Sequence, residues 1–221
     1  YQPIVNITTN QIVGLEALAR LRMPDGAVVS AGQFYTALSD PRIAYEMTGQ
    51  MLTQVARDMR HWLDVGLNFQ HVGVNVTTGD FLRGDLADRI IDIFGRASVP
   101  LSHIVLEVNE AVFMGSSDKI VPNAVEALRA RGILVALDDF GTGFASLTHL
   151  LSFPVDIIKI DRSFVTRLGV DGPSEALVSG IVDIAHKLDM RTVAEGVERE
   201  EQAEMLRRLG CNLAQGYLYA R

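Results

Sequence analysis

The sequence predicts an α/β fold, a TIM-like (β/α)8 barrel in which one strand near the N-terminus runs antiparallel to the others. Three observations support this prediction: apolar stretches that end in polar residues recur along the chain, helical patterns lie between them, and the first two strands are joined by a loop too short to hold a helix. The chain has 221 residues, of which 48% are hydrophobic, which is enough for one large core. We therefore expect residues 1–221 to form a single domain.

The first two strands are expected at residues 1–5 and 12–18, which are rich in apolar residues. Only six polar or turn-prone positions separate them, whereas a crossover between parallel strands needs about a dozen residues or more. The two strands should therefore form an antiparallel hairpin. Glu16 should project from the second strand of this hairpin.

Helical patterns fill the intervals between the later strands. Asp40 and Pro41 form a good N-cap and first-turn pair for the first long helix. Its apolar residues recur every four positions and should face the barrel: Ile43, Met47, Met51, Val55 and Met59. Methionines at this spacing also suit a groove for a partner, but core packing is the preferred interpretation. Further helices fit residues 85–97, 118–131, 174–189 and 199–209.

Five of the apolar stretches that we interpret as strands end in polar residues: Asn75, Glu107, Asp138, Lys159 and Glu195. The steps between these residues are 32, 31, 21 and 36 positions, each long enough for a strand and a returning helix. Parallel strands of a barrel present their C-terminal ends to one mouth. These side chains should therefore converge on a single pocket.

Two adjacent carboxylates, Asp138 and Asp139, end the apolar stretch at residues 134–137. Negative charges at the end of a buried strand are costly unless cations or hydrogen-bond donors meet them, so the pair suggests a metal site. Neighbouring side chains of a regular strand point to opposite faces. Both aspartates can serve one cavity only if the second already lies on a loop, which Gly141 and Gly143 permit. An Asp-rich turn that caps a helix is an equally weighted alternative for this segment alone.

Composition excludes several classes of protein. The net charge of −7 argues against a domain that binds DNA or RNA, because such domains carry clustered Lys and Arg. No apolar stretch approaches the roughly 20 residues of a membrane helix, and no signal peptide opens the chain. We expect a cytoplasmic domain without membrane contact, even if a longer parent protein is membrane-anchored. The single cysteine, Cys211, excludes an internal disulfide and suits a reducing compartment.

Short motifs are distributed along the whole chain in this order: YQPIV at 1–5, EAL at 16–18, NVT at 75–77, LEVNE at 106–110, DDFGTG at 138–143, KID at 159–161, AEGVE at 194–198 and QGYL at 215–218. With these motifs the chain resembles, over essentially its whole length, the EAL domain of bacterial cyclic di-GMP phosphodiesterases. The resemblance implies hydrolysis of cyclic di-GMP to linear pGpG by a two-metal mechanism. Because the chain starts with the first motif and stops just after the last, we expect a domain excised from a longer signalling protein.

The resemblance implies two divalent cations. One is bound by four residues: Glu16, Asn75, Glu107 and Asp138. A second is bound with the help of Asp138, Asp139 and Asp161. Carboxylate and amide oxygens select hard cations, so Mg²⁺ or Mn²⁺ is expected, and the five histidines show no zinc-ligand spacing. Ca²⁺ prefers longer bonds and more ligands, so it should inhibit.

The resemblance also implies three catalytic residues: Lys159, Glu195 and Glu16. It places Lys159 beside the attacking water, where an ammonium can orient the water and stabilise developing negative charge. Glu195 is expected to be a general base or an organiser of the site. Lys159 and Asp161 lie two positions apart on a strand and should share a face. A purely structural ion pair between Lys159 and a carboxylate is the alternative.

Substrate contacts are implied for three residues: Gln2, Arg20 and Gln215. The guanidinium of Arg20 matches phosphate oxygens and can stack on guanine, although a surface salt bridge is its alternative role. Glu110 is implied to anchor the loop after Asp139, because residues 141–145 have few side chains to hold a turn. In the family this loop links the metal site to a dimer interface, so a homodimer is expected.

Two other functions remain as alternatives. The first is a catalytically silent receptor that only binds cyclic di-GMP. The second is an unrelated barrel enzyme that acts on another phosphorylated metabolite, which would rest on the fold alone. The active phosphodiesterase is favoured because the sequence keeps every expected metal ligand and the lysine.

Overall fold

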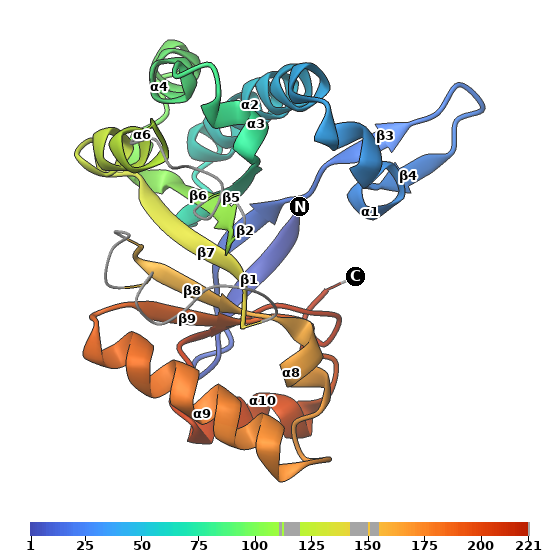
Figure 1. The fold of residues 1–221 in the computed structure, drawn as a ribbon, viewed down its shortest axis with the longest axis vertical. Coiled ribbons are helices and arrows are strands. Elements are labelled where there is room, and N and C mark those ends of the chain that lie inside the picture. The colour runs from blue at the N-terminus through green and yellow to red at the C-terminus, as the bar shows by residue number, and fades with distance from the viewer. Residues whose placement is uncertain (111, 113–119, 142–149, 151–154, 221) are drawn as a thin grey trace.

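Eight strands close into a barrel in this computed structural model, which describes residues 1–110, 112, 120–141, 150 and 155–220 (Figure 1). Around the barrel the strands follow the order β1 (Gln2–Asn6), β10 (Leu213–Ala214), β9 (Arg191–Ala194), β8 (Ile157–Ile160), β7 (Leu134–Phe140), β6 (Ile104–Asn109), β5 (His71–Val76) and β2 (Ile12–Ala17). Strand β1 pairs antiparallel with both β2 and β10, and every other neighbouring pair is parallel. The predicted barrel with one reversed strand is confirmed.

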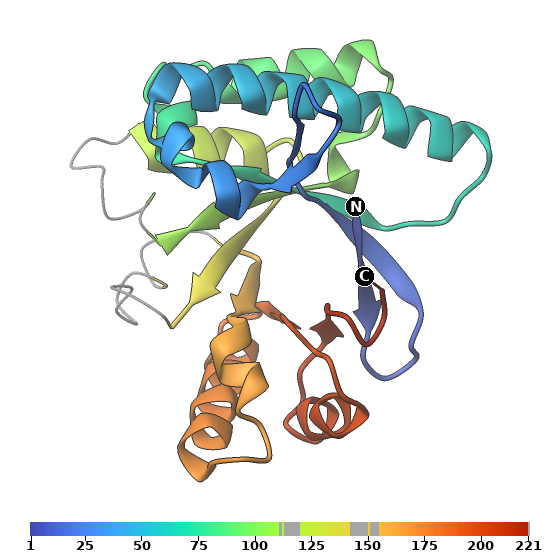
Figure 2. The ribbon, with the colours of Figure 1, turned by 90° about the vertical axis from the view of Figure 1, so that its right-hand side faces the viewer.

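The helices pack on the outside of the barrel, in two groups on opposite sides (Figures 1 and 2). One group contains α2 (Pro41–Asp64), α3 (Thr78–Phe81), α4 (Leu86–Arg96) and α6 (Ile120–Arg129). The other contains α8 (Arg162–Thr166), α9 (Gly172–Lys187) and α10 (Glu200–Arg208). These bounds confirm the four further helices expected from the sequence, to within a few residues where the chain is described. Among the described helices, none offers the long uncharged apolar stretch that a bilayer span requires.

Helix α2 begins as predicted, but its buried face differs from the predicted one. The Asp40 side chain accepts a hydrogen bond from the Arg42 backbone N–H at 2.9 Å, and Pro41 occupies the first turn. The buried residues are Ala44, Thr48, Leu52, Val55, Ala56 and Met59. Ile43 is 46% exposed, so the predicted stripe is wrong at its start. Residues spaced four apart rotate by about 40° around a helix at each step. When the last residues of such a series face the core, the first ones therefore point away from it.

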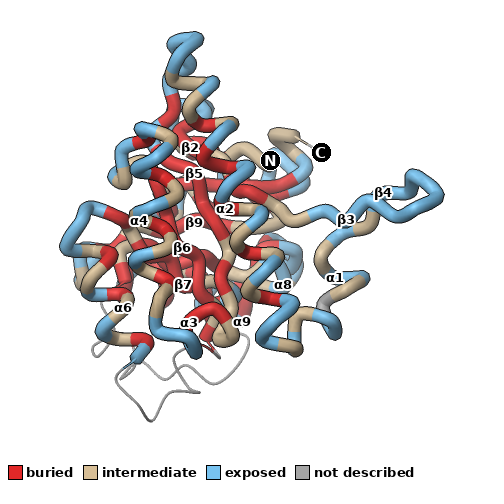
Figure 3. Tube along the Cα trace, turned by 90° about the horizontal axis from the view of Figure 1, so that it is seen from above, coloured by how far each residue is buried: buried red, intermediate tan, exposed pale blue. Residues whose placement is uncertain are grey.

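A hairpin of β3 (Arg20–Arg22) and β4 (Val28–Ser30) projects from the barrel, followed by α1 (Ala31–Phe34) and a 3₁₀ turn at Tyr35–Ser39 (Figures 1 and 3). Gly26 adopts a φ of 87° at the tip of the hairpin, a conformation that glycine tolerates without steric cost. Both strands of this hairpin are largely exposed. The hairpin is not predicted by the sequence pattern, because its short strands bury little apolar surface.

A cluster of apolar side chains fills the barrel interior below the polar strand ends, and we call it the floor: Ile4, Val13, Leu213, Val193, Ile157, Ala136 and Val105. On five strands the residue two positions beyond a floor residue is polar: Glu107, Asp138, Lys159, Glu195 and Gln215. Residues two apart on a strand point to the same face, so the polar layer lies directly above the floor. A larger apolar cluster lies between the strands and the outer helices.

His71 on β5 is buried, and its ring packs so closely on Gly14 that a Cβ added to Gly14 would overlap it. Burial, with smaller contributions from Arg191 and His103, lowers the pKa of His71 from 6.5 to about 4. The unfolded chain therefore takes up a proton here below about pH 6.5, whereas the folded chain keeps the imidazole neutral down to about pH 4. Stability contributed by the neutral ring is complete above this window and is lost as the pH falls through it.

We expect the free energy of unfolding to decrease by about 2–3 kcal/mol between about pH 6.5 and pH 4 because of His71. His71→Gln cannot be protonated and should remove this part of the pH dependence, as measured by urea unfolding across that range. His61→Gln is the matched control, because His61 is exposed on α2. An unchanged pH dependence in His71→Gln would contradict the assignment.

Candidate active site

The polar layer at the C-terminal ends of the strands is centred on Lys159, whose side chain is only 2% exposed. Its Nζ lies 2.6 Å from a carboxylate oxygen of Glu107 and 2.7 Å from one of Glu195. Oxygens of Asp138 and Glu16 lie 3.1 and 3.4 Å from the same nitrogen. Burial opposes the charged form of Lys159, but the four carboxylates outweigh it and hold the pKa of the ammonium well above its usual range. Lys159 therefore stays charged.

One lysine cannot neutralise all the carboxylates around it. Burial raises the pKa of Glu107 well above its usual value, and burial likewise raises the pKa of Glu195 to about 7. Burial, followed by the charges of Asp138 and Asp161, raises the pKa of Asp139 to about 6. Neighbouring carboxylates add to the effect of burial at all three residues, and a divalent cation would favour the charged forms.

Glu16 is held differently from the other carboxylates. Its Oε1 accepts a hydrogen bond from Asn75 Nδ2 at 2.8 Å, and its Oε2 accepts one from Gln215 Nε2 at 2.6 Å. Burial raises the pKa of Glu16, but Lys159 and these two amides together lower it below its usual value. Gln215 also donates to Gln2 Oε1 at 2.7 Å, so its side chain links β1, β2 and the end of β10. These contacts connect Gln2, Glu16, Asn75 and Gln215.

Gly73 on β5 makes room for the buried carboxylate of Glu107. A Cβ added to Gly73 would overlap the Glu107 carboxylate. The neighbouring strands β5 and β6 pair Asn75 with Glu107, so the site residues of these two strands lie at the same level. A side chain at position 73 would therefore displace Glu107 from Lys159.

Asp138 and Asp139 are brought to one site by a bulge rather than by a loop. Strand β7 continues to Phe140, and its pairing with β8 shifts between Leu137 and Phe140. Asp139 adopts a φ of 55°, in the left-handed region that Asp tolerates better than most residues. Ligand oxygens of Asp138, Asp139 and Glu195 lie within 4.8 Å of one another. The expectation that Asp139 already lies on a loop is therefore wrong, although both aspartates do face the site.

The donors present fit a divalent cation. Every candidate ligand offers oxygen, which suits Mg²⁺ or Mn²⁺. The Oε1 atom of Gln215 is buried and has no hydrogen-bond partner among the described residues, as expected beside a site that holds water or an ion. Asp161 lies next to Asp139 and raises its pKa, while its Oδ1 accepts from the Ser163 N–H at 2.9 Å and caps α8. Asp161 thus borders the site.

A cavity of about 250 Å³ opens at this site, lined by Gln2, Glu16, Leu18, Asp138, Arg162, Glu195, Gly196, Glu198, Gln215, Gly216 and Tyr217. Three polar residues of this lining were not singled out as site residues from the sequence: Arg162, Glu198 and Tyr217. Arg162 follows the KID motif, and the other two lie within AEGVE and QGYL, so their places beside motif residues were the available signal. Gly196 has a φ of 66°, and a Cβ there would lie 2.5 Å from the Arg162 Cβ.

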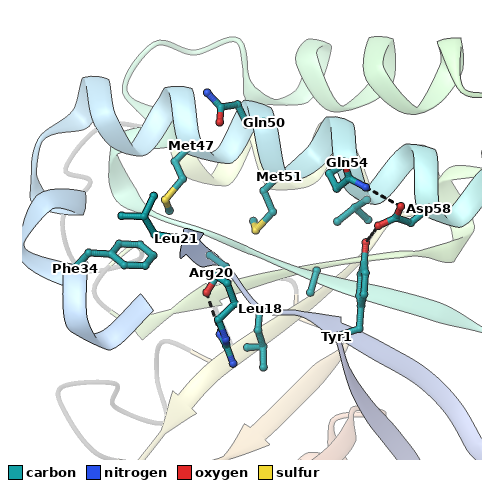
Figure 4. Close-up of a pocket in the computed structure, with 13 residues that line it drawn as sticks. Tyr1, Leu18, Arg20, Leu21, Phe34, Met47, Gln50, Met51, Gln54 and Asp58 are labelled. Atoms are coloured by element: carbon teal, nitrogen blue, oxygen red, sulfur yellow. Dashed lines mark hydrogen bonds between the residues drawn. The ribbon is translucent and has the colours of Figure 1, made fainter. Parts of the chain in front are cut away.

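Arg20 lies apart from the carboxylates, on a second cavity of about 290 Å³ between the start of β3 and helix α2 (Figure 4). Its Nη1 donates to the Ala19 carbonyl at 2.9 Å, and its guanidinium extends beside Leu18, away from Met47 and Gln50 (Figure 4). Leu18 lines both cavities, so the two adjoin. Met47 borders this second cavity, which corrects the prediction that it packs in the core.

Glu110 is buried just beyond β6 and accepts a hydrogen bond from the Gly141 backbone N–H at 3.1 Å. Gly141 is the first residue after β7 and adopts a φ of 96°. A hydrogen bond from Glu110 to the backbone of this loop is therefore present. Residues 142–145, the rest of the loop that was predicted to be weakly held, lie outside the described residues.

Known proteins resemble this chain over its whole length. The chain is 37% identical over 221 residues to the bifunctional diguanylate cyclase/cyclic di-GMP phosphodiesterase MucR of Pseudomonas aeruginosa, covering all of this chain and 32% of MucR. A solved structure of PaMucR phosphodiesterase in complex with c-di-GMP has a TM-score of 0.93 at 37% identity and is covered to 89% by this chain.

A second solved structure is more distant. It is a complex of Klebsiella pneumoniae BlrP1 with manganese and cyclic di-GMP, with a TM-score of 0.84 at 27% identity; the similarity covers 98% of this chain and 53% of that one. BlrP1 has also been solved with calcium and cyclic di-GMP. A family model described as the EAL domain matches residues 1–221. The chain therefore belongs to the EAL domain family.

Proposed function

We propose that this domain hydrolyses cyclic di-GMP to linear pGpG with the help of two divalent cations, Mg²⁺ or Mn²⁺. The observation that carries the proposal is the buried lysine at the mouth of the barrel, held among carboxylates that exceed it in charge. The names of MucR and of the two complexes support the same substrate. Since this chain spans 32% of MucR, we further propose that it serves as one catalytic domain of a longer signalling protein.

Six residues are proposed to hold the cations: Glu16, Asn75, Glu107, Asp138, Asp139 and Asp161. When bound, such cations supply charge stabilisation to phosphoryl oxygens and lower the pKa of water. Lys159 is proposed to orient the attacking water and to stabilise the charge that develops in the transition state. Glu195, whose Oε1 lies 2.7 Å from Lys159 Nζ, holds this ammonium in place and is the candidate acceptor of the proton from water.

The nucleotide is proposed to bind across the adjoining cavities. Gln2 and Gln215 line the cavity that contains the carboxylates, and Arg20 lines its neighbour. The guanidinium of Arg20 offers a fork of donors for a phosphate of the substrate. Arg20→Ala should therefore weaken nucleotide binding more than it lowers turnover at saturation.

Incubation of the domain with cyclic di-GMP and Mg²⁺, followed by chromatography of the nucleotides, tests the proposed function. Linear pGpG should accumulate in proportion to enzyme concentration and time. Nucleotide that binds, as measured by calorimetry, but is recovered unchanged would instead support the silent receptor. Turnover of a different phosphorylated metabolite in preference to cyclic di-GMP would contradict both.

Glu110→Ala should weaken the apparent affinity for Mg²⁺ and lower turnover, although Glu110 is not a proposed ligand. The side chain accepts from Gly141 N–H at 3.1 Å and thereby holds the chain that follows Asp139. Loss of a residue that supports ligands in this way typically costs about 10–100-fold in metal affinity or activity. Glu126→Ala on α6 is a suitable control. An unchanged Mg²⁺ titration in a folded Glu110→Ala domain would contradict the anchoring role.

We also propose that the domain acts in the cytoplasm, where the free, buried Cys211 remains reduced.

We further propose that the domain forms a homodimer. If the dimer is the active form, specific activity and sedimentation should change together as protein concentration is varied. Concentration-independent activity of a monomer would contradict a role for the dimer. Ca²⁺ is proposed to inhibit, since it occupies oxygen sites with longer bonds than Mg²⁺.

A further inference from the structure

The carboxylate of Asp80 lies fully buried on α3, immediately after the end of β5. Its Oδ2 accepts hydrogen bonds from the backbone N–H of Thr77 at 2.9 Å, the Thr77 hydroxyl at 3.0 Å and the Thr48 hydroxyl of α2 at 3.1 Å. Its Oδ1 accepts from Nη2 of Arg89 on α4 at 3.2 Å. One carboxylate thus joins the end of a barrel strand to two outer helices.

The outer side of this polar network is held by an aromatic ring. Arg89 donates from Nη1 to the Tyr45 carbonyl at 3.0 Å, and its guanidinium lies 3.9 Å from the centre of the Tyr45 ring. The guanidinium of Arg83 lies at the same distance from that ring. The Tyr45 hydroxyl donates to Asp85 at 2.8 Å. Arg89 is therefore fixed independently of Asp80, and its position restrains the carboxylate.

Thr77 and Asp80 form a capping box, which stabilises the start of α3. The added pairing with Arg89 on α4 needs a separate account. An ion pair that is buried loses its hydration, and apolar residues of the same volume often stabilise a fold as well or better. A carboxylate adds directional hydrogen bonds, because several donors must point at its two oxygens. Two of those donors belong to Thr77, which lies two residues beyond Asn75 on the same strand end.

We propose that Asp80 is a positioning residue for Asn75 and thereby for the binding of a divalent cation at the mouth of the barrel. This inference rests on the proposed function, in which Asn75 is a metal ligand. Asn75 donates to Glu16 Oε1 at 2.8 Å from its Nδ2, which turns the amide so that its oxygen remains available to a cation. By holding Thr77, Asp80 restricts how far the end of β5 can move away from Glu16.

Mg²⁺ and Mn²⁺ binding, measured by calorimetry in the absence of nucleotide, tests the proposal without relying on activity. Asp80→Asn should weaken binding by about tenfold, the effect typical of losing a group that supports a ligand. Asp156→Asn is the matched control. Asp156 also accepts a backbone N–H, that of Val135 at 2.8 Å, and pairs with Arg129 at 2.6 Å, but it lies just before β8 at the opposite end of the barrel. This control should bind metal as the wild type does.

A milder pair of variants covers the case in which Asp80→Asn does not fold. Thr48→Val removes one hydrogen bond to Asp80 and should weaken metal binding by a few-fold. Thr53→Val makes the same substitution on the same helix, where the hydroxyl donates to the Gly49 carbonyl of α2 itself at 2.8 Å, and should leave metal binding unchanged.

The outcomes separate positioning from general stability. Weaker metal binding in Asp80→Asn or Thr48→Val, with both controls unchanged, supports the proposal. Variants that melt at lower temperature but bind metal as the wild type does would overturn it, as would an equal loss of binding in Asp156→Asn. A wild-type domain that binds neither cation would refute the proposed function itself and this inference with it.

Discussion

Removal of divalent cations is expected to reduce the hydrolysis of cyclic di-GMP to the background rate. The four carboxylates that contact Lys159 carry more negative charge than one ammonium can balance, so without cations they repel the phosphates of the substrate. Mg²⁺ or Mn²⁺ added after chelation should restore activity. Ca²⁺ should restore nucleotide binding without turnover, because it tolerates longer bonds and places water less strictly.

Chromatographic assays at a series of free metal concentrations measure this dependence. Asp138→Asn should shift the response to higher metal concentration by more than about tenfold. Asp64→Asn is the control, since Asp64 pairs with Arg60 on the surface of α2. Full activity in excess chelator would rule out a two-metal mechanism.

Replacement of Lys159 by Met is expected to lower kcat by about 10²–10³-fold while nucleotide affinity changes little. The ammonium is buried and charged, with carboxylate oxygens 2.6 to 3.4 Å away, and its proposed effect is exerted on charge in the transition state. Glu195→Gln should act in the same direction because it removes the partner 2.7 Å from Lys159 Nζ. Steady-state kinetics and calorimetry in Ca²⁺ separate turnover from binding.

Lys187→Met provides the matched control for this substitution. Lys187 is exposed at the C-terminal end of α9, which leads to the N-terminal end of β9, whereas the proposed site residues lie at the C-terminal ends of the strands. Its replacement should alter neither kcat nor affinity. Normal turnover in a folded Lys159→Met domain would show that the lysine serves only as a structural ion-pair partner.

Much of the barrel could be predicted from local patterns. The loop between residues 6 and 11 is too short for a crossover, and this alone required β1 to pair antiparallel with β2. Apolar runs ending at Asn75, Glu107 and Lys159 indicated which side chains meet at the mouth, because the C-terminal ends of parallel strands lie together. These inferences succeeded since each depends on chain length or on the two-residue repeat of a strand.

Other features were missed or were predicted wrongly because the sequence carries little local signal for them. The bulge at Asp138 and Asp139 depends on the register between β7 and β8, which packing across both strands determines. The buried face of α2 depends on how the helix is rotated on the barrel, so Ile43 became exposed and Thr48 buried. Contacts within the helix could not distinguish these orientations.

The sequence by itself determined the order of the first seven barrel strands and of the five longer helices, the reversed first strand and the residues that stand at the strand ends. Only the tertiary structure decided which of these residues touch. Lys159 became the centre of four carboxylates, and Gln215 came to bond Glu16, a residue 199 positions earlier. Such contacts arise when the barrel closes, because closure sets the register of all the strands at once and no segment alone contains that information.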